Sequence, residues 1–183
     1  EQISPQFEQG LAKIKKITES MKVAPKIDIT EAEVESKPIL YISETSTLDP
    51  NEIGEKMGAA YGEIMALAGI AQLEMASAPI AITEKFYPEE MVCEFNAALT
   101  FNEIPEDLEL LGRIEKGETY SGKVLKTTHV GPYANLHGTY EAIMAYIKDN
   151  GYEINGNSWE EYVDDPTKVA EEELRTIIYF PIK

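Results

Sequence analysis

The sequence has few cysteines and histidines, the residues that build disulfides and most zinc sites. Cys93 is the only cysteine, and 183 residues include two histidines, His129 and His137. One cysteine excludes an internal disulfide and a cysteine-based zinc site, and it is typical of a reducing compartment, so we expect a cytoplasmic protein. The two histidines lack further ligands at metal-binding spacing, so we expect neither a metal site nor a cofactor.

Positive charge and long apolar runs are also scarce. Sixteen Lys and Arg stand against 33 Asp and Glu, which gives a formal net charge of −17. Nucleic-acid phosphates and anionic lipids would repel such an acidic protein, so we expect no direct binding to DNA. No apolar run approaches the length that crosses a bilayer, so we expect no membrane contact. The hydrophobic content of 43% is enough to bury one core.

The first 27 residues differ from the rest. Between Ser4 and Met21, apolar residues recur at spacings of three and four, at Phe7, Leu11, Ile14, Ile17 and Met21. This spacing predicts an amphipathic helix, and Pro25 then interrupts it. We therefore expect a helix and linker over residues 1–27 and a separate domain over residues 28–183. The chain does not begin with methionine, so we expect a fragment or a processed product.

The remaining residues contain an internal repeat. Residues 60–66 match residues 139–145 at four of seven positions, with an offset of 79 residues. Each of these helical segments follows a strand-like run, and each precedes two more strand candidates. The runs lie at 38–42, 79–86 and 91–101 in the first half and at 123–127, 158–163 and 173–182 in the second.

This order of elements predicts an α+β fold of two β-α-β-β repeats, with halves at about 28–104 and 105–183. Each repeat would form a short antiparallel sheet with a helix on one face. The two halves would bury their remaining apolar surface against each other. The groove between them is then the expected ligand site.

The strand candidate at 158–163 carries the clearest candidate site. Alternation puts Glu160 and Tyr162 on one face and Glu161 on the other. The offset of 79 gives Ala81 and Thr83 as their equivalents in the first half, so the polar pair belongs to one half only. Two interpretations stay open from these residues: a ligand-binding face, or an edge strand with a solvated glutamate.

Tyrosine is abundant, with ten residues that combine a rigid aromatic ring with a polar tip. Tyr133, Tyr140 and Tyr179 lie nearest the elements of the second half, and we expect them to contact ligand with Glu160 and Tyr162. Ordinary core packing is the alternative for each of them. His129 lies where a strand turns into a helix; a general base is one interpretation, but no nucleophile motif accompanies it.

Three short motifs together resemble the GyrI-like small-molecule-binding family. They are residues 129–133 (His-Val-Gly-Pro-Tyr), residues 160–162 (Glu-Glu-Tyr) followed by Asp165-Pro166, and residues 178–182 (Ile-Tyr-Phe-Pro-Ile). This family includes a DNA gyrase inhibitor and the effector-binding domains of multidrug-responsive transcription regulators. The resemblance covers about residues 28–183 and implies a central groove that binds lipophilic, often cationic or aromatic, molecules.

The resemblance also implies roles for particular residues. A glutamate two positions before a tyrosine is the polar anchor in the family's groove, which matches Glu160 and Tyr162. Glu161 stands where the family usually has an aliphatic residue, so either carboxylate could face the groove. Some relatives are hydrolases of cyclopropane-bearing natural products. The expected function is therefore a sensor, carrier or sequestering module, and the alternatives are a hydrolase using Glu160 or a protein-interaction domain.

Two further expectations concern partners. The chain contains no helix-turn-helix motif, so control of transcription would need an upstream domain or a regulator as partner. Residues 7–15 resemble the last helix of a polyketide cyclase or START-like domain, and a helix native to this domain is the alternative.

Overall fold

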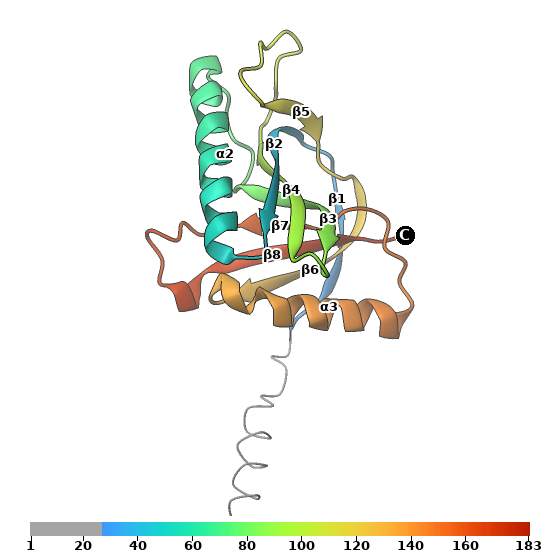
Figure 1. The fold of residues 1–183 in the computed structure, drawn as a ribbon. Helices are drawn as coiled ribbons and strands as arrows, with labels where there is room; N and C mark the ends of the chain where they lie inside the picture. Colours follow the sequence, from blue (N-terminus) through green and yellow to red (C-terminus); the bar gives the residue numbers. More distant parts are fainter. Residues whose placement is uncertain (1–26) are drawn as a thin grey trace, which may run out of the picture.

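The computed structural model describes residues 27–183. The helix predicted between Ser4 and Met21, and its resemblance to a START-like helix, lie outside the described residues. Over residues 27–183 the fold is α+β, as predicted, with one antiparallel sheet and two main helices (Figure 1). Neither α-helix in this part of the chain is long and apolar enough to cross a membrane.

Both halves have the β-α-β-β order that the sequence predicts. The first half contains β2 (Pro38–Thr47), α2 (Pro50–Ala71), β3 (Ile80–Tyr87) and β4 (Val92–Thr100). The second contains β6 (Gly122–Val130), the short helix η1 (Tyr133–Asn135), α3 (Leu136–Asn150), β7 (Trp159–Tyr162), η2 (Glu171–Glu173) and β8 (Arg175–Pro181). Two short strands, β1 (Thr30–Val34) and β5 (Glu115–Glu118), precede the two halves.

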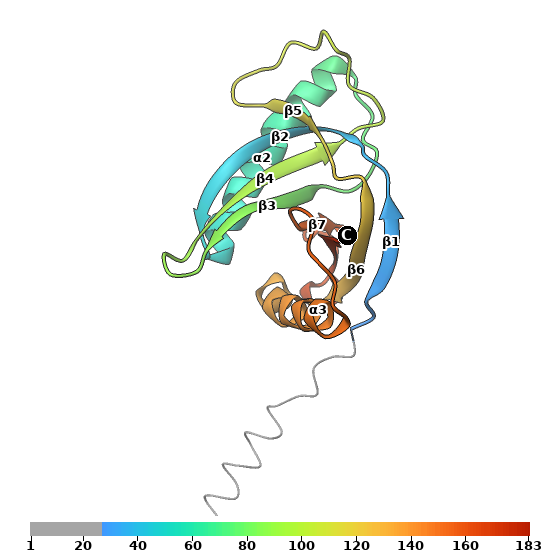
Figure 2. The same ribbon diagram turned by 90° about the vertical axis from the view of Figure 1, so that its right-hand side faces the viewer.

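The strands form one continuous sheet rather than the two expected sheets. Their order is β1-β6-β8-β7-β3-β4-β2-β5, and all pairs are antiparallel. The halves join where β7 pairs with β3, since two unpaired strand edges at the centre would leave backbone groups unsatisfied. Each outer strand pairs across the halves: β1 adds to β6, and β5 adds to β2. Figure 2 shows how strongly this sheet curves.

The helices begin and end with ordinary capping residues. Asp49 caps α2 by accepting a hydrogen bond from the backbone N–H of Asn51 at 2.8 Å, and Pro50 takes the first helical position. Gly151 ends α3 in the left-handed conformation with φ of 71°, which glycine adopts without strain.

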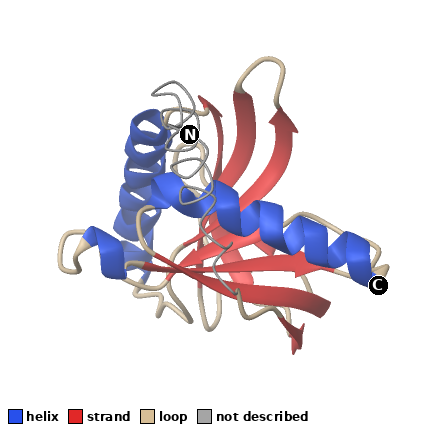
Figure 3. Ribbon diagram, turned by 90° about the horizontal axis from the view of Figure 1, so that it is seen from below, coloured by secondary structure: helices blue, strands red, loops and turns tan. Residues whose placement is uncertain are grey.

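Both helices cover the same face of the sheet, one over each half (Figure 3). Directly paired residues share a face, so the row on this helix-covered face can be followed through the register. It runs through Ile42, Ala97, Ala81, Glu160, Ile178 and Thr127. Under α2 the core includes Ile42 and Ala97, and under α3 it includes Ile178. Glu160 thus lies in the middle of the row, between the two cores.

Candidate functional site

Glu160 lies at the centre of the sheet, on the face that carries the helices. Its strand, β7, runs between β8 and β3, where Glu160 pairs with Ile178 on one side and Ala81 on the other. Ala81 is the residue that the offset of 79 gives as its equivalent. The interpretation of an edge strand with a solvated glutamate is therefore wrong.

Two tyrosine hydroxyls donate to the Glu160 carboxylate. Tyr140 of α3 donates to Oε1 at 2.6 Å, and Tyr162 of β7 donates to Oε2 at 2.6 Å. Both bonds are partly buried, and short bonds to an ionised acceptor are stronger than those between neutral groups. Each carboxylate oxygen keeps further lone pairs, so the site can accept more donors or a cation.

Glu161 faces the opposite side of the sheet, as alternation predicts. Its carboxylate accepts a hydrogen bond from the Tyr179 hydroxyl at 2.8 Å. Tyr179 in turn stacks on Trp159, with ring centroids 4.7 Å apart and planes inclined by 9°. Glu160, and not Glu161, is thus the carboxylate that meets Tyr140 and Tyr162. Tyr179 lies away from the Glu160 site, on the other face.

Tyr133 adds an aromatic ring beside Tyr162. It begins η1 directly after Gly131 and Pro132, and Gly131 has a φ of 129°, which side-chain-bearing residues rarely adopt. The Tyr133 and Tyr162 rings meet edge to face, with centroids 5.6 Å apart and an angle of 86°. Four of the five predicted site residues therefore come together, from β7, η1 and α3.

Tyr61 of α2 is a site residue that the sequence analysis did not select. Its hydroxyl donates to the backbone oxygen of Ile80 at 2.9 Å, next to Ala81. Met57, one turn earlier on α2, has its sulfur 3.9 Å from the Tyr162 hydroxyl. The signal for Tyr61 was present in the repeat, because the offset of 79 matches Tyr61 with Tyr140.

Burial and the negative charge of Glu160 act together on the tyrosines. Burial, then Glu160, raises the pKa of Tyr140 and of Tyr162 well above the ordinary value of 10.0. The same two causes raise the pKa of Tyr61. The pKa of Tyr133 is also raised, chiefly by burial and then by Asp164 and Glu160. At neutral pH these phenols stay protonated and act as hydrogen-bond donors.

His129 has a structural role in the turn before α3. It is buried; its Nδ1 lies 2.8 Å from the Thr139 hydroxyl and its Nε2 lies 3.2 Å from the Pro132 carbonyl oxygen. The carbonyl can only accept, so the arrangement fits a proton on Nε2 and acceptance by Nδ1. Both nitrogens are engaged, which leaves none for the general base considered above. In residues 27–183, no three His, Cys, Asp or Glu gather as metal ligands.

Comparisons with known proteins agree with this fold. The GyrI-like small molecule binding domain family matches residues 27–183. No curated protein sequence matches the chain. The C-terminal domain of EcmrR is similar in structure, with a TM-score of 0.70 and 20% identity over 86% of this chain and 98% of that one. EcmrR in a complex with DNA gives a TM-score of 0.66 and 18% identity, over 97% of this chain and 67% of that one.

Two other solved structures share the fold. A hydrolase from Listeria innocua has a TM-score of 0.58 and 16% identity, over 92% of this chain and 98% of that one. SAV2435, solved with bound tetraphenylphosphonium, has a TM-score of 0.57 and 15% identity, over 85% of this chain and 94% of that one. At these identities the likeness establishes a common fold, and the ligands and activities in these names are those of the other proteins.

Proposed function

The chain belongs to the GyrI-like small molecule binding domain family, and from that premise we propose that it binds lipophilic cations or flat aromatic molecules against Glu160. It would act as the effector-binding part of a sensor, or as a carrier or sequestering module. One observation carries the proposal: a single partly buried carboxylate accepts hydrogen bonds from Tyr140 and Tyr162 between two helices.

The chemistry of the tyrosines supports an aromatic or cationic ligand. A cation over an aromatic face gains about 0.5–2 kcal/mol, more where water is excluded. Tyr61, Tyr133, Tyr140 and Tyr162 surround one negative charge, and burial raises the pKa of all four. A lipophilic cation would therefore meet both a counter-charge and π faces. The tetraphenylphosphonium bound by SAV2435 belongs to this class of ligand.

Tetraphenylphosphonium is the natural probe for this proposal. We expect calorimetry to show binding that weakens about tenfold or more in Glu160→Gln, which removes the charge and keeps the shape. Glu161→Gln is the matched control, because the same change on the neighbouring residue faces the other side of the sheet. Equal affinity in wild type and Glu160→Gln, or equal losses in both variants, would contradict the assignment of the anchor.

A hydrolase is the second candidate, favoured by the similarity to the Listeria innocua hydrolase. Glu160 would take a proton from a water molecule as the water oxygen bonds to the electrophilic carbon. The strained carbon–carbon bond would break, the proton would pass to the departing carbon, and Tyr162 would donate a hydrogen bond. The test is turnover of an activated cyclopropane, measured beside binding. Loss of turnover in Glu160→Gln with binding retained supports this mechanism, and equal turnover in the variant excludes it.

The setting of the domain follows from charge and composition. With a net charge of −17, control of transcription would run through another domain or a partner regulator. EcmrR, which is similar in structure, was solved in a complex with DNA. The single cysteine, Cys93, supports a reducing compartment such as the cytoplasm.

A further inference from the structure

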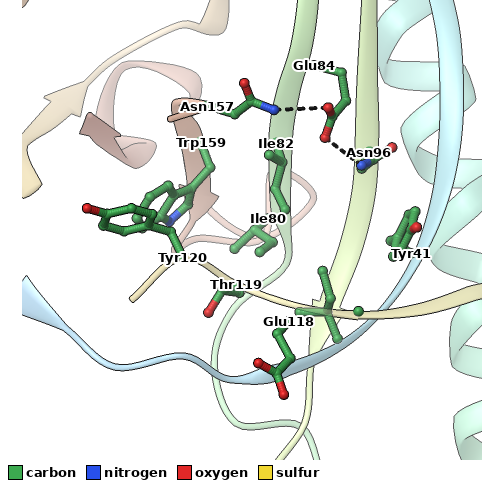
Figure 4. A pocket seen from close by; sticks show the side chains of 12 residues that line it. Tyr41, Ile80, Ile82, Glu84, Asn96, Glu118, Thr119, Tyr120, Asn157 and Trp159 are labelled. Atoms are coloured by element: carbon green, nitrogen blue, oxygen red, sulfur yellow. Dashed lines mark hydrogen bonds between the residues drawn. The ribbon is translucent and has the colours of Figure 1, made fainter. Parts of the chain in front are cut away.

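The face of the sheet opposite the helices contains a cavity of about 280 Å³ (Figure 4). Its floor consists of Ile39, Ile80 and Ile82 from β2 and β3. By the register, Ile80 pairs with Glu161 and Ile82 with Trp159, so the cavity faces away from Glu160. This cavity is therefore separate from the site proposed above.

One wall of the cavity is aromatic and held in place. Trp159 stacks on Tyr179, whose hydroxyl is fixed by Glu161, and Tyr120 leans on Trp159 with centroids 6.3 Å apart and an angle of 41°. Tyr41 closes the other side (Figure 4). Because this wall is already ordered, its side chains lose little conformational entropy when a ligand binds.

The rims of the cavity are anionic. Glu84 lies at a register shift between Thr83 and Lys85 of β3, and such bulges commonly re-aim a side chain. Its two oxygens accept hydrogen bonds from the amides of Asn96 at 2.8 Å and Asn157 at 2.9 Å. These donors are neutral, so they orient the carboxylate without cancelling its charge.

Glu118 lies at the opposite rim, across the apolar floor (Figure 4). Within the described residues 27–183, no Lys or Arg lines this cavity. A carboxylate or phosphate ligand would thus meet like charge on both rims. An ammonium ion would meet opposite charge there and aromatic faces beside it.

We propose that this cavity is a second ligand site, which takes an organic ammonium ion whose apolar body lies on the isoleucine floor and whose charge is held by Glu84. The site is independent of the function proposed for Glu160. The second site would therefore select primary amines that carry an aromatic or aliphatic group.

The test uses phenethylamine, with 2-phenylethanol as the neutral ligand of nearly the same shape. Trp159 is the only tryptophan in the chain, so its fluorescence reports on the cavity wall. We expect wild type to bind the amine about threefold or more tightly than the alcohol, the scale of an exposed ion pair. Glu84→Gln should remove that preference. Glu109→Gln, an equal change of charge in an exposed loop, should keep it.

Glu160→Gln separates this inference from the proposed function. We expect that variant to keep the preference for the amine over the alcohol while it loses affinity for tetraphenylphosphonium. Equal affinities for amine and alcohol in wild type, an unchanged preference in Glu84→Gln, or a preference lost in Glu160→Gln would each overturn the second site. The tetraphenylphosphonium result tests the Glu160 site alone.

Discussion

Two phenol hydroxyls hold the Glu160 carboxylate, and each can be removed without changing the ring. Tyr140→Phe leaves Oε1 without its donor in a partly buried place, so we expect unfolding to need about 1 kcal/mol less free energy. Tyr41→Phe is the matched control, because its hydroxyl donates to the exposed Glu115 at 3.2 Å. Urea unfolding measures the stability of both variants. Equal stability of Tyr140→Phe and wild type would contradict a stabilising hydrogen bond from Tyr140 to Glu160.

The raised pKa values of Tyr140 and Tyr162 give a dependence on alkaline pH. A folded-state pKa above the ordinary 10.0 contributes stability that is full below pH 10 and is lost as the pH rises through the folded values. We therefore expect unfolding in alkali to accompany the late part of the tyrosinate absorbance titration. In Glu160→Gln that part should move to lower pH, because burial remains and the repelling charge is gone. If the tyrosinate titration of Glu160→Gln matched that of the wild type, Glu160 would not lie against Tyr140 and Tyr162.

At the scale of single residues, the sequence predicted the polar pair and not all of its surroundings. Strand alternation put Glu160 with Tyr162 and apart from Glu161, which the hydrogen bonds confirm. Tyr179 could not be placed in the same way, because β8 is apolar on both faces and its pattern does not tell which one meets the helices. Tyr61 could have been predicted by applying the offset of 79 residues to the site residue Tyr140.

At the scale of elements, a buried polar pair joins α3 to the sheet, beside the apolar contacts under that helix. The Thr139 hydroxyl on α3 meets Nδ1 of His129 on β6 at 2.8 Å. Thr139→Val keeps the shape and leaves that nitrogen unpaired, so we expect a loss of about 1–2 kcal/mol in the free energy of unfolding.

Thr176 on β8 offers a matched control for that substitution. It pairs with His129 in the register, and its buried hydroxyl has no hydrogen-bond partner among residues 27–183. Thr176→Val should therefore leave stability unchanged or raise it. Thermal and urea unfolding measure the stability of both variants. If Thr176→Val lost more free energy of unfolding than Thr139→Val, the bond between Thr139 and His129 would not be the stabilising one.

The elements themselves show what local patterns can and cannot predict. The two helices and the six strands of the β-α-β-β halves follow from apolar periodicity, and each matches a predicted segment. The short strands β1 and β5 were missed, because Thr-Glu-Ala-Glu-Val and Glu-Lys-Gly-Glu carry little apolar signal. Both are outer strands that form by pairing with residues far away in the sequence. The pairing of β3 with β7, which joins the halves, is also between distant residues, so local patterns could not predict it.

At the scale of the molecule, a net charge of −17 means that the folded chain repels itself. Salt at about 0.1 M screens charges beyond about 10 Å. We therefore expect the melting temperature to rise by about 2–4 °C between low and moderate sodium chloride, equivalent to about 1 kcal/mol. Tetramethylammonium chloride, at matched ionic strength, should give the same rise. If the melting temperature fell in both salts, repulsion between the acidic side chains would not be the main electrostatic effect on stability.

The curved sheet separates two chemistries on its two faces. Glu160 and its tyrosines lie under the helices, and Glu84 with Trp159 lies on the open side. A crystal structure of the chain with tetraphenylphosphonium would show whether Glu160 holds the ligand. We predict that the phosphonium lies between α2 and α3, nearer to Glu160 than to any other carboxylate, and that the bond from Tyr140 or Tyr162 is displaced. A phosphonium on the opposite face, with both tyrosine bonds to Glu160 intact, would contradict it.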